Sequence, residues 1–231
     1  MLTLEGLTIR QGTFELRADL SIPRGAHVTV IGPSGAGKST LLSVIGGFFE
    51  ATSGRILWND LRIDDLPPGK RPVATIFQDN NLFPHMTTEQ NVALGIRPSG
   101  RLRGAEPQQV RGALKSVGLD GFGDRKPGAL SGGQQSRVAL ARAMVQDRPL
   151  LLLDEPFAAL GPALRVEMLD LVTQLARDGG RTLMIVTHDP DDARRVDGQT
   201  ILVADGQAAP PQPTGPLLDD PPPALRAYLG P

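Results

Sequence analysis

The sequence predicts an α/β fold: a mixed, mostly parallel sheet flanked by helices, with an N-terminal antiparallel β part and an inserted helical lobe. Three observations support this prediction. The N-terminal residues alternate between apolar and polar side chains, several later segments are short uninterrupted apolar runs, and helical patterns separate those runs. A half-buried antiparallel strand alternates, whereas a strand buried on both faces of a parallel sheet is apolar throughout.

The antiparallel part is predicted from a period of two near the N-terminus, where apolar side chains at every second position define a buried face. These apolar residues are Phe14, Leu16, Ala18, Leu20 and Ile22. The later runs HVTVI, ATIF, LLLLD and TLMIVT are predicted to be core strands. Helices are expected after Lys38 and around 106–117, 134–147 and 163–177, and this alternation of strands and helices indicates an α/β core.

The chain is predicted to be one domain of residues 1–231. Its core comprises 1–82 and 147–207, and residues 83–146, which are mostly helical in character, form the inserted lobe. The segment 208–231 is rich in proline, which removes backbone donors and restricts φ. It is therefore predicted to be an extended surface tail without regular structure.

Composition narrows the class of function. The chain has 24 basic and 25 acidic residues and a formal charge of -1, which argues against a nucleic-acid partner. It has no cysteine, so disulfides and thiol chemistry are excluded. Met1 leads directly into an alternating strand pattern rather than a signal peptide. No run approaches the roughly 18 apolar residues of a membrane span, so another chain must supply any membrane segment.

The strongest local motif is GPSGAGKST, which matches G-x-x-x-x-G-K-[ST] between a predicted strand and a predicted helix. Glycines let the backbone bring N–H groups against phosphate oxygens, and the helix N-terminus favours an anion. The motif predicts a P-loop NTPase core that binds ATP, with Lys38 on the β- and γ-phosphates and Ser39 on Mg²⁺; the alternative is a structural glycine turn. The phosphate loop comprises Gly32, Pro33, Ser34, Gly35, Ala36, Gly37, Lys38, Ser39 and Thr40.

A second motif, LLLLDEP, places two carboxylates at the end of a buried strand. In open α/β sheets ligands bind at that edge. Asp154 suits the oxygen shell of Mg²⁺, and Glu155 suits a general base acting on the attacking water. Taken alone, a solvated turn explains the pair equally well, but a phosphate loop earlier in the chain favours the catalytic interpretation.

A third motif, LSGGQ, contains a capping box in which Ser131 and Gln134 start a helix. Gly132 and Gly133 would lie in the first turn, where small residues let an anion approach bare N–H groups. The alternative is a well-capped surface helix without a ligand.

The three motifs, together with the TH pair that ends in His188, resemble the ATPase subunits of ABC transporters in their order along nearly the whole chain. The resemblance implies a head-to-tail dimer with ATP between the phosphate loop of one copy and residues Ser131, Gly132, Gly133 and Gln134 of the other. It also implies that Gln78 contacts Mg²⁺ and the attacking water, that His188 contacts the γ-phosphate, and that Lys38 and Glu155 are catalytic.

Two positions depart from the family pattern. After the second motif the family usually has S-A-L-D, and here Gly161 replaces the carboxylate that helps to link the two ATP sites. The aromatic residue that usually stacks on adenine is replaced by Gln11. Phe14 is nearby, but its place on the apolar face of a strand predicts that it belongs to the core.

The segment FQDNNLFPHMTTEQNVALGI, with PPGKRPV before it, resembles the ATPases of thiamine importers of Gram-negative bacteria. This implies an importer motor for thiamine or its phosphates, peripheral on the cytoplasmic face of the inner membrane, working with an integral membrane permease and a periplasmic solute-binding protein. On this interpretation Phe83, Pro84 and Met86 would be exposed apolar contacts with the permease; the alternative is that they pack between the two lobes. Importers for iron, polyamines, or sulfate and molybdate stay open, as do a soluble non-transport ABC ATPase and a regulatory protein without turnover.

Overall fold

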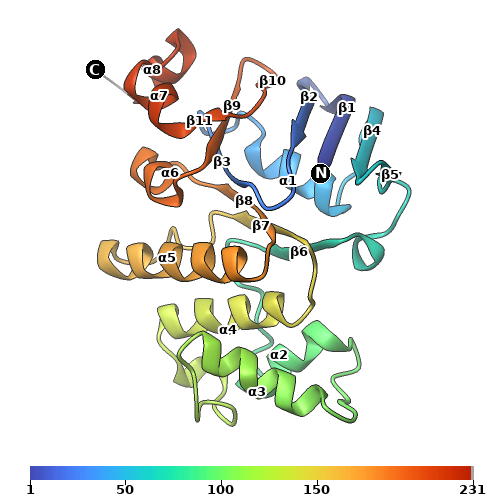
Figure 1. The fold of residues 1–231 in the computed structure, drawn as a ribbon, viewed down its shortest axis with the longest axis vertical. Coiled ribbons are helices and arrows are strands. Elements are labelled where there is room, and N and C mark those ends of the chain that lie inside the picture. Colours follow the sequence, from blue (N-terminus) through green and yellow to red (C-terminus); the bar gives the residue numbers. More distant parts are fainter. Residues whose placement is uncertain (230–231) are drawn as a thin grey trace.

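The computed structural model describes residues 1–229, which form an 11-stranded sheet with helices on both faces (Figure 1). The N-terminal strands pair antiparallel in the order β5, β4, β1, β2. Alternating residues of β1 and β2 are buried, as their sequence period predicts. The bounds are β1 (Leu2–Gln11), β2 (Phe14–Ile22), β4 (Ser53–Trp58) and β5 (Leu61–Arg62).

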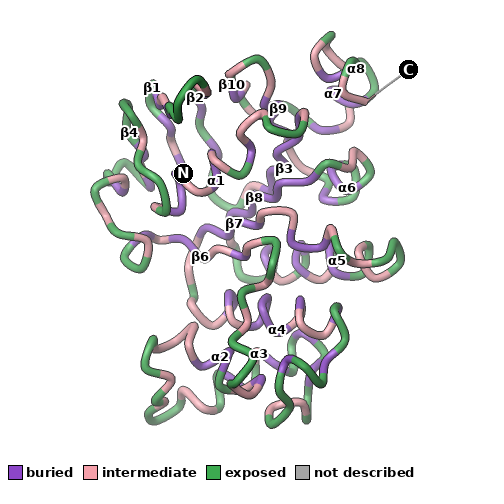
Figure 2. Tube along the Cα trace, turned by 180° about the vertical axis from the view of Figure 1, so that it is seen from behind, coloured by how far each residue is buried: buried purple, intermediate pink, exposed green. Residues whose placement is uncertain are grey.

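The centre of the sheet is parallel, in the order β9, β3, β8, β7, β6. Strand β7 shows why these strands are apolar throughout: Leu150 and Leu152 enter one hydrophobic cluster, and Leu151 and Leu153 enter another. Figure 2 shows this buried centre. The mixed sheet predicted from the sequence is confirmed. Its strands are β3 (His27–Ile31), β6 (Val73–Ile76), β7 (Leu150–Asp154), β8 (Thr182–Val186) and β9 (Gln199–Ala204).

Helices α2, α3 and α4 lie together at one end of the molecule, beyond α5 and the edge strand β6 (Figure 1). Side chains of all four helices share one hydrophobic cluster with β6, β7 and β8. Within residues 1–229 no helix is long and apolar enough to cross a membrane. The bounds are α1 (Lys38–Gly46), α2 (Thr88–Ile96), α3 (Glu106–Ser116), α4 (Gly132–Met144), α5 (Pro162–Asp178) and α6 (Pro190–Val196), with 3₁₀ turns at Pro68–Lys70 and Pro127–Ala129.

The C-terminal segment differs from the prediction that it lacks regular structure. It contains β10 (Gln207–Ala208), β11 (Gln212–Pro213), α7 (Thr214–Asp219) and α8 (Pro223–Leu229). The prolines are compatible with these helices because Pro223 is the first residue of α8 and Pro216 the third of α7, where a backbone N–H has no partner within the helix. Leucines of α7 and α8 are buried against β3 and β9, and this packing fixes the segment.

Candidate functional site

The phosphate loop connects β3 to the first residue of α1, as predicted, and its residues line a polar cleft of about 330 Å³. Backbone N–H groups at the start of α1 have no partners within the helix, so this end of the cleft favours an anion. The cleft is lined by Gln11, Phe14, Ser34, Gly35, Gly37, Lys38, Ser39, Thr40 and Glu155.

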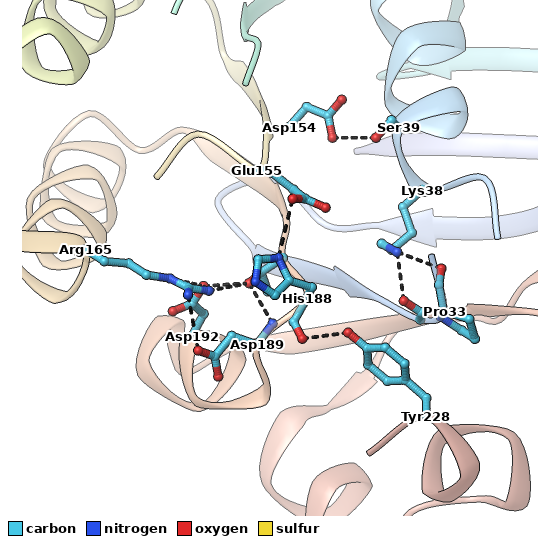
Figure 3. A network of polar contacts seen from close by, with 12 residues as sticks. Pro33, Lys38, Ser39, Asp154, Glu155, Arg165, His188, Asp189, Asp192 and Tyr228 are labelled. Carbon is cyan, nitrogen blue, oxygen red and sulfur yellow. Dashed lines mark hydrogen bonds and ion pairs between the residues drawn. The ribbon is translucent and has the colours of Figure 1, made fainter. Parts of the chain in front are cut away.

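Lys38 is held by the loop from which it projects. Its Nζ donates to the carbonyl oxygens of Gly32 at 2.7 Å and Pro33 at 2.9 Å (Figure 3). Burial lowers the pKa of the Lys38 ammonium, while Glu155 and Asp154 act in the opposite direction. A buried ammonium beside the cleft is a point charge placed to attract phosphate oxygens.

Two of the three predicted magnesium ligands, Ser39 and Asp154, contact each other. Ser39 Oγ donates to Asp154 Oδ1 at 2.8 Å, which joins the first turn of α1 to the end of β7 (Figure 3). Burial raises the pKa of the Asp154 carboxyl, and Glu155 adds to this, while the Ser39 hydrogen bond and Lys38 oppose it. Mg²⁺ in nucleotide sites takes one or two protein oxygens together with phosphate oxygens, so this hydroxyl and carboxylate fit the ion.

The structure brings Glu155 and His188 together, although 33 residues separate them in the chain. Glu155 Oε2 lies 3.4 Å from His188 Nδ1, and the two residues follow the neighbouring strands β7 and β8. Glu155 has a φ of 44°, in the left-handed region that few residues other than glycine adopt. Backbone strain of this kind is concentrated at functional sites, and here it directs the carboxylate into the cleft.

A buried ion pair that the sequence analysis missed supports the loop containing His188. Arg165 on α5 donates through Nε to Asp192 Oδ2 at 3.0 Å, and Thr187 Oγ1 donates to the same oxygen at 2.5 Å. Arg165 Nη1 also lies 3.3 Å from Asp189 Oδ2. An arginine in the first turn of one helix and an aspartate in the next are ordinary in sequence, so only the fold reveals the contact.

Helix α4, which starts within the LSGGQ motif, begins as predicted, and we call Ser131, Gly132, Gly133 and Gln134 its signature segment. Ser131 Oγ accepts from Gln134 N at 3.3 Å, and Gln134 Oε1 accepts from Ser131 N at 2.9 Å. Ser131 and Gly132 are exposed, and none of the four signature residues lines the phosphate-loop cleft of the same chain. Gly133 is buried because Leu164 of α5 covers it.

We expect the side chain of Gly133→Ala to clash with Leu164, and we expect Leu164→Ala to remove that clash. A Cβ at Gly133 would lie 2.4 Å from Leu164 Cδ2, a distance that real Cβ atoms do not show. Because the end of the half-buried Leu164 side chain can shift, the single variant should lower the thermal midpoint and the ATPase rate only slightly, and the double variant with Leu164→Ala should recover that loss. Equal rates for Gly133→Ala and the double variant would contradict this explanation.

Gln78 lies just beyond the end of β6, is exposed, and makes no side-chain hydrogen bond within the part of the chain that the structure describes. Phe14 packs against the core as predicted, but it also lines the cleft beside Gln11. Its ring lies so close to the phosphate loop that a Cβ at Gly37 would be 2.5 Å from Phe14 Cζ.

Gly161 occupies the N-cap of α5 with a φ of −64° and a ψ of 156°, which any residue adopts. No atom lies within 4 Å of a Cβ built there, and no side chain caps the helix. The replacement of the family carboxylate by glycine is therefore not imposed by the backbone.

Gly161→Asp is expected to raise the free energy of unfolding by about 0.3–0.5 kcal/mol, since aspartate caps a helix better than glycine and complements its dipole. Gly161→Ala provides the matched control, because alanine is a poorer N-cap than glycine and should lower stability. Urea denaturation of the parental chain, Gly161→Asp and Gly161→Ala measures both the expected gain and the expected loss in the free energy of unfolding. A loss of stability in Gly161→Asp would show that the site does not accept a cap.

The fold and the cleft match a known class of protein. Residues 16–158, more than half of the chain, match the family described as ABC transporter, and the chain therefore belongs to this family. The family match, the import ATP-binding relatives and the ATP-binding cassette structures described below show that the chain is an ATP-binding subunit that hydrolyses ATP.

Two curated relatives share the full length of the chain. Both are named thiamine import ATP-binding protein ThiQ. The protein from Cereibacter sphaeroides is 58% identical over 231 residues, and the one from a Ruegeria species is 59% identical over 230 residues; each alignment covers 100% of both chains.

Solved structures support the same class. The dimeric ATP-binding cassette MJ0796 in a post-hydrolysis state with ADP and Pi has a TM-score of 0.79 and 31% identity, covering 93% of this chain and 99% of that chain. The ADP conformation of MJ1267, an ATP-binding cassette of an ABC transporter, has a TM-score of 0.88 and 26% identity, covering 100% of this chain and 99% of that chain.

Proposed function

We propose that this chain is the ATP-hydrolysing motor subunit of a bacterial importer for thiamine or its phosphates. The observation that carries the proposal is similarity over the full length to two thiamine import ATP-binding proteins, at 58% and 59% identity. The cargo itself passes through the permease, so no residue of this chain needs to contact it.

Two copies bind head to tail, with each ATP between the phosphate loop of one copy and the signature segment of the other. The exposure of Ser131 and Gly132 outside their own chain's cleft supports this arrangement. ATP binding closes the pair and moves the permease, which receives cargo from a periplasmic binding protein, and hydrolysis reopens the pair.

Within each site Glu155 orients the attacking water and accepts its proton, and His188 beside it contacts the γ-phosphate. Lys38 stabilises negative charge on the transferring group in this partly buried cleft. Ser39, Asp154 and Gln78 would hold Mg²⁺, which supplies charge neutralisation between the β- and γ-phosphates when it is bound.

The permease contacts exposed aromatic side chains, namely Phe83 and the adjacent pair Phe48 and Phe49, which are 45%, 46% and 50% exposed. Large apolar side chains in contact with water favour a protein partner. Phe48 packs edge to face on Phe77 at 4.9 Å, and Phe77 precedes Gln78, so Phe48 adjoins the strand end that leads to the proposed Mg²⁺ contact. In this proposal the motor works at the cytoplasmic face of the inner membrane, where it contacts the permease.

Uptake of labelled thiamine tests the proposal. A source strain lacking the gene should lose uptake and recover it with the parental chain but not with Glu155→Gln. Gly161→Asp in the same strain reports what the missing carboxylate costs in transport. Uptake that never depends on the gene would show that the cargo is wrong, and iron, polyamines and oxyanions would then be screened in the same strain.

A further inference from the structure

The last helix of the described chain reaches the loop of the catalytic histidine. Tyr228 of α8 donates its hydroxyl to the backbone carbonyl oxygen of His188 at 2.6 Å (Figure 3). The distance is that of a strong O–H···O hydrogen bond, and it joins residues 40 positions apart in the sequence. It links a C-terminal segment with no motif to a residue of the ATP site.

Hydrophobic packing of the C-terminal helices positions Tyr228. Leu225, three residues before it, is fully buried, and it shares a hydrophobic cluster with Ile31 and Leu202. Arg194 of α6 pairs with Asp219 of α7 at 2.8 Å. The C-terminal helices α7 and α8 therefore rest on the strand that leads into the phosphate loop and on the helix that follows His188.

The phenol is suited to act as a donor at this place. Burial raises the pKa of Tyr228, and the negative charges of Glu155 and Asp189 raise it further. A tyrosine hydroxyl is protonated at neutral pH even without this shift, and here it donates to the carbonyl oxygen of His188.

Hydrogen bonds and an ion pair hold the residues on either side of His188. Thr187 Oγ1 accepts from the backbone N of Asp189 at 3.1 Å, and Arg165 of α5 pairs with Asp189 at 3.3 Å. These contacts lie on the residues flanking His188, whereas Tyr228 bonds to His188 itself. The imidazole is 53% exposed, so packing alone does not fix it beside Glu155.

We propose that Tyr228 is a positioning residue for ATP hydrolysis: its hydroxyl fixes the backbone at His188 and thereby keeps the imidazole beside Glu155. Phosphoryl transfer then depends on the correct docking of the C-terminal helices, although these helices do not line the nucleotide cleft. The inference rests on the proposed catalytic roles of Glu155 and His188.

Steady-state ATPase assays of the purified full-length chain test this inference. Tyr228→Phe keeps the ring and removes the hydroxyl, and should lower kcat by about 2- to 10-fold, the effect of one hydrogen bond, with little change in KM for ATP or in thermal midpoint. Arg226→Met is the matched control on α8, because Arg226 bonds only to Asp220 and Pro221 in the described chain and should leave kcat at the parental value.

The His188→Ala background separates positioning from a structural role. If Tyr228 acts through the imidazole, adding Tyr228→Phe to His188→Ala should lower kcat no further. A full additional loss in that background, or a parental kcat in Tyr228→Phe alone, would overturn the inference. If His188→Ala alone keeps the parental kcat, the proposed role of His188 fails, and the inference fails with it for that distinct reason.

Hydrogen exchange gives a readout that does not depend on turnover. Backbone amides of residues 187–189 should exchange faster in Tyr228→Phe than in the parental chain, while those of α5 stay unchanged. Unaltered exchange at 187–189 would show that the hydroxyl does not restrain this loop and would overturn the proposal.

Discussion

Replacing Glu155 by glutamine is expected to lower kcat for ATP hydrolysis by about 10²- to 10⁴-fold, the range for losing a general base, with nucleotide affinity nearly unchanged. Glutamine keeps the size of the side chain but does not accept a proton from water. The contacts expected to bind the phosphates come from the phosphate loop, and these stay intact. The imidazole of His188, 3.4 Å from the carboxylate, also loses its charged neighbour.

ATPase assays and binding of a fluorescent ATP analogue measure the two parts of this prediction. Glu167→Gln is the matched control, because Glu167 is 60% exposed, pairs with Arg137 of α4, and does not line the cleft. Arg137 keeps its hydrogen bond to the Val117 carbonyl oxygen when Glu167 is replaced, so the rate should remain at the parental value. A parental rate in Glu155→Gln would show that another residue activates the water.

The parts of the candidate site that can be predicted from the sequence are those whose residues lie close together in the chain. Gly32–Thr40 lies between one strand and one helix, and Asp154 and Glu155 follow directly from the apolar run of β7. In such segments the residue types themselves impose the geometry. The register of parallel strands then brings Asp154 beside Ser39 and His188 beside Glu155 without further information.

The remaining contacts depend on tertiary packing and have no local signature. Arg165 and Asp192 meet because α5 and α6 cover adjacent strands, and nothing in either segment marks the pair. Proline density predicts an irregular C-terminal segment only when the position of each proline in its helix is ignored. Leu217 and Leu218 of α7 and Leu225 of α8 are buried against β3 and β9, and this packing compensates for the prolines.

Replacing Arg71 by methionine is expected to lower the free energy of unfolding by about 3–5 kcal/mol, the cost of breaking a buried charged network. Arg71 is only 4% exposed. Its guanidinium donates to four backbone carbonyl oxygens, those of Val44 at 2.7 Å, Ile45 at 2.9 Å, Leu66 at 2.8 Å and Asp64 at 2.9 Å. Methionine fills similar volume but donates to none of these acceptors; the Val44 oxygen keeps the Gly47 N–H at 3.2 Å, and the other three lose their side-chain donor.

Two of the four carbonyls belong to the last turn of α1, whose first residues are Lys38 and Ser39. A positive charge at a helix C-terminus complements the macrodipole and satisfies carbonyls that have no N–H partner within the helix. Arg71 therefore anchors the far end of the helix that carries two residues of the ATP site. The loss of stability in Arg71→Met should be accompanied by weaker ATP binding in the folded fraction.

Urea denaturation distinguishes the guanidinium geometry from its charge. Arg71→Lys keeps the charge but loses the planar fork, so it should fall between the parental chain and Arg71→Met. Arg62→Met is the matched control: Arg62 is 51% exposed, pairs with Asp64, and should change stability by less than about 1 kcal/mol. If Arg71→Met unfolds at the parental urea midpoint, the carbonyls find other partners and the anchoring role is wrong. If Arg71→Met does not fold at all, a urea midpoint for Arg71→Lys below that of the parental chain still supports the role of the guanidinium hydrogen bonds. A parental midpoint for Arg71→Lys would show that the positive charge alone stabilises the fold.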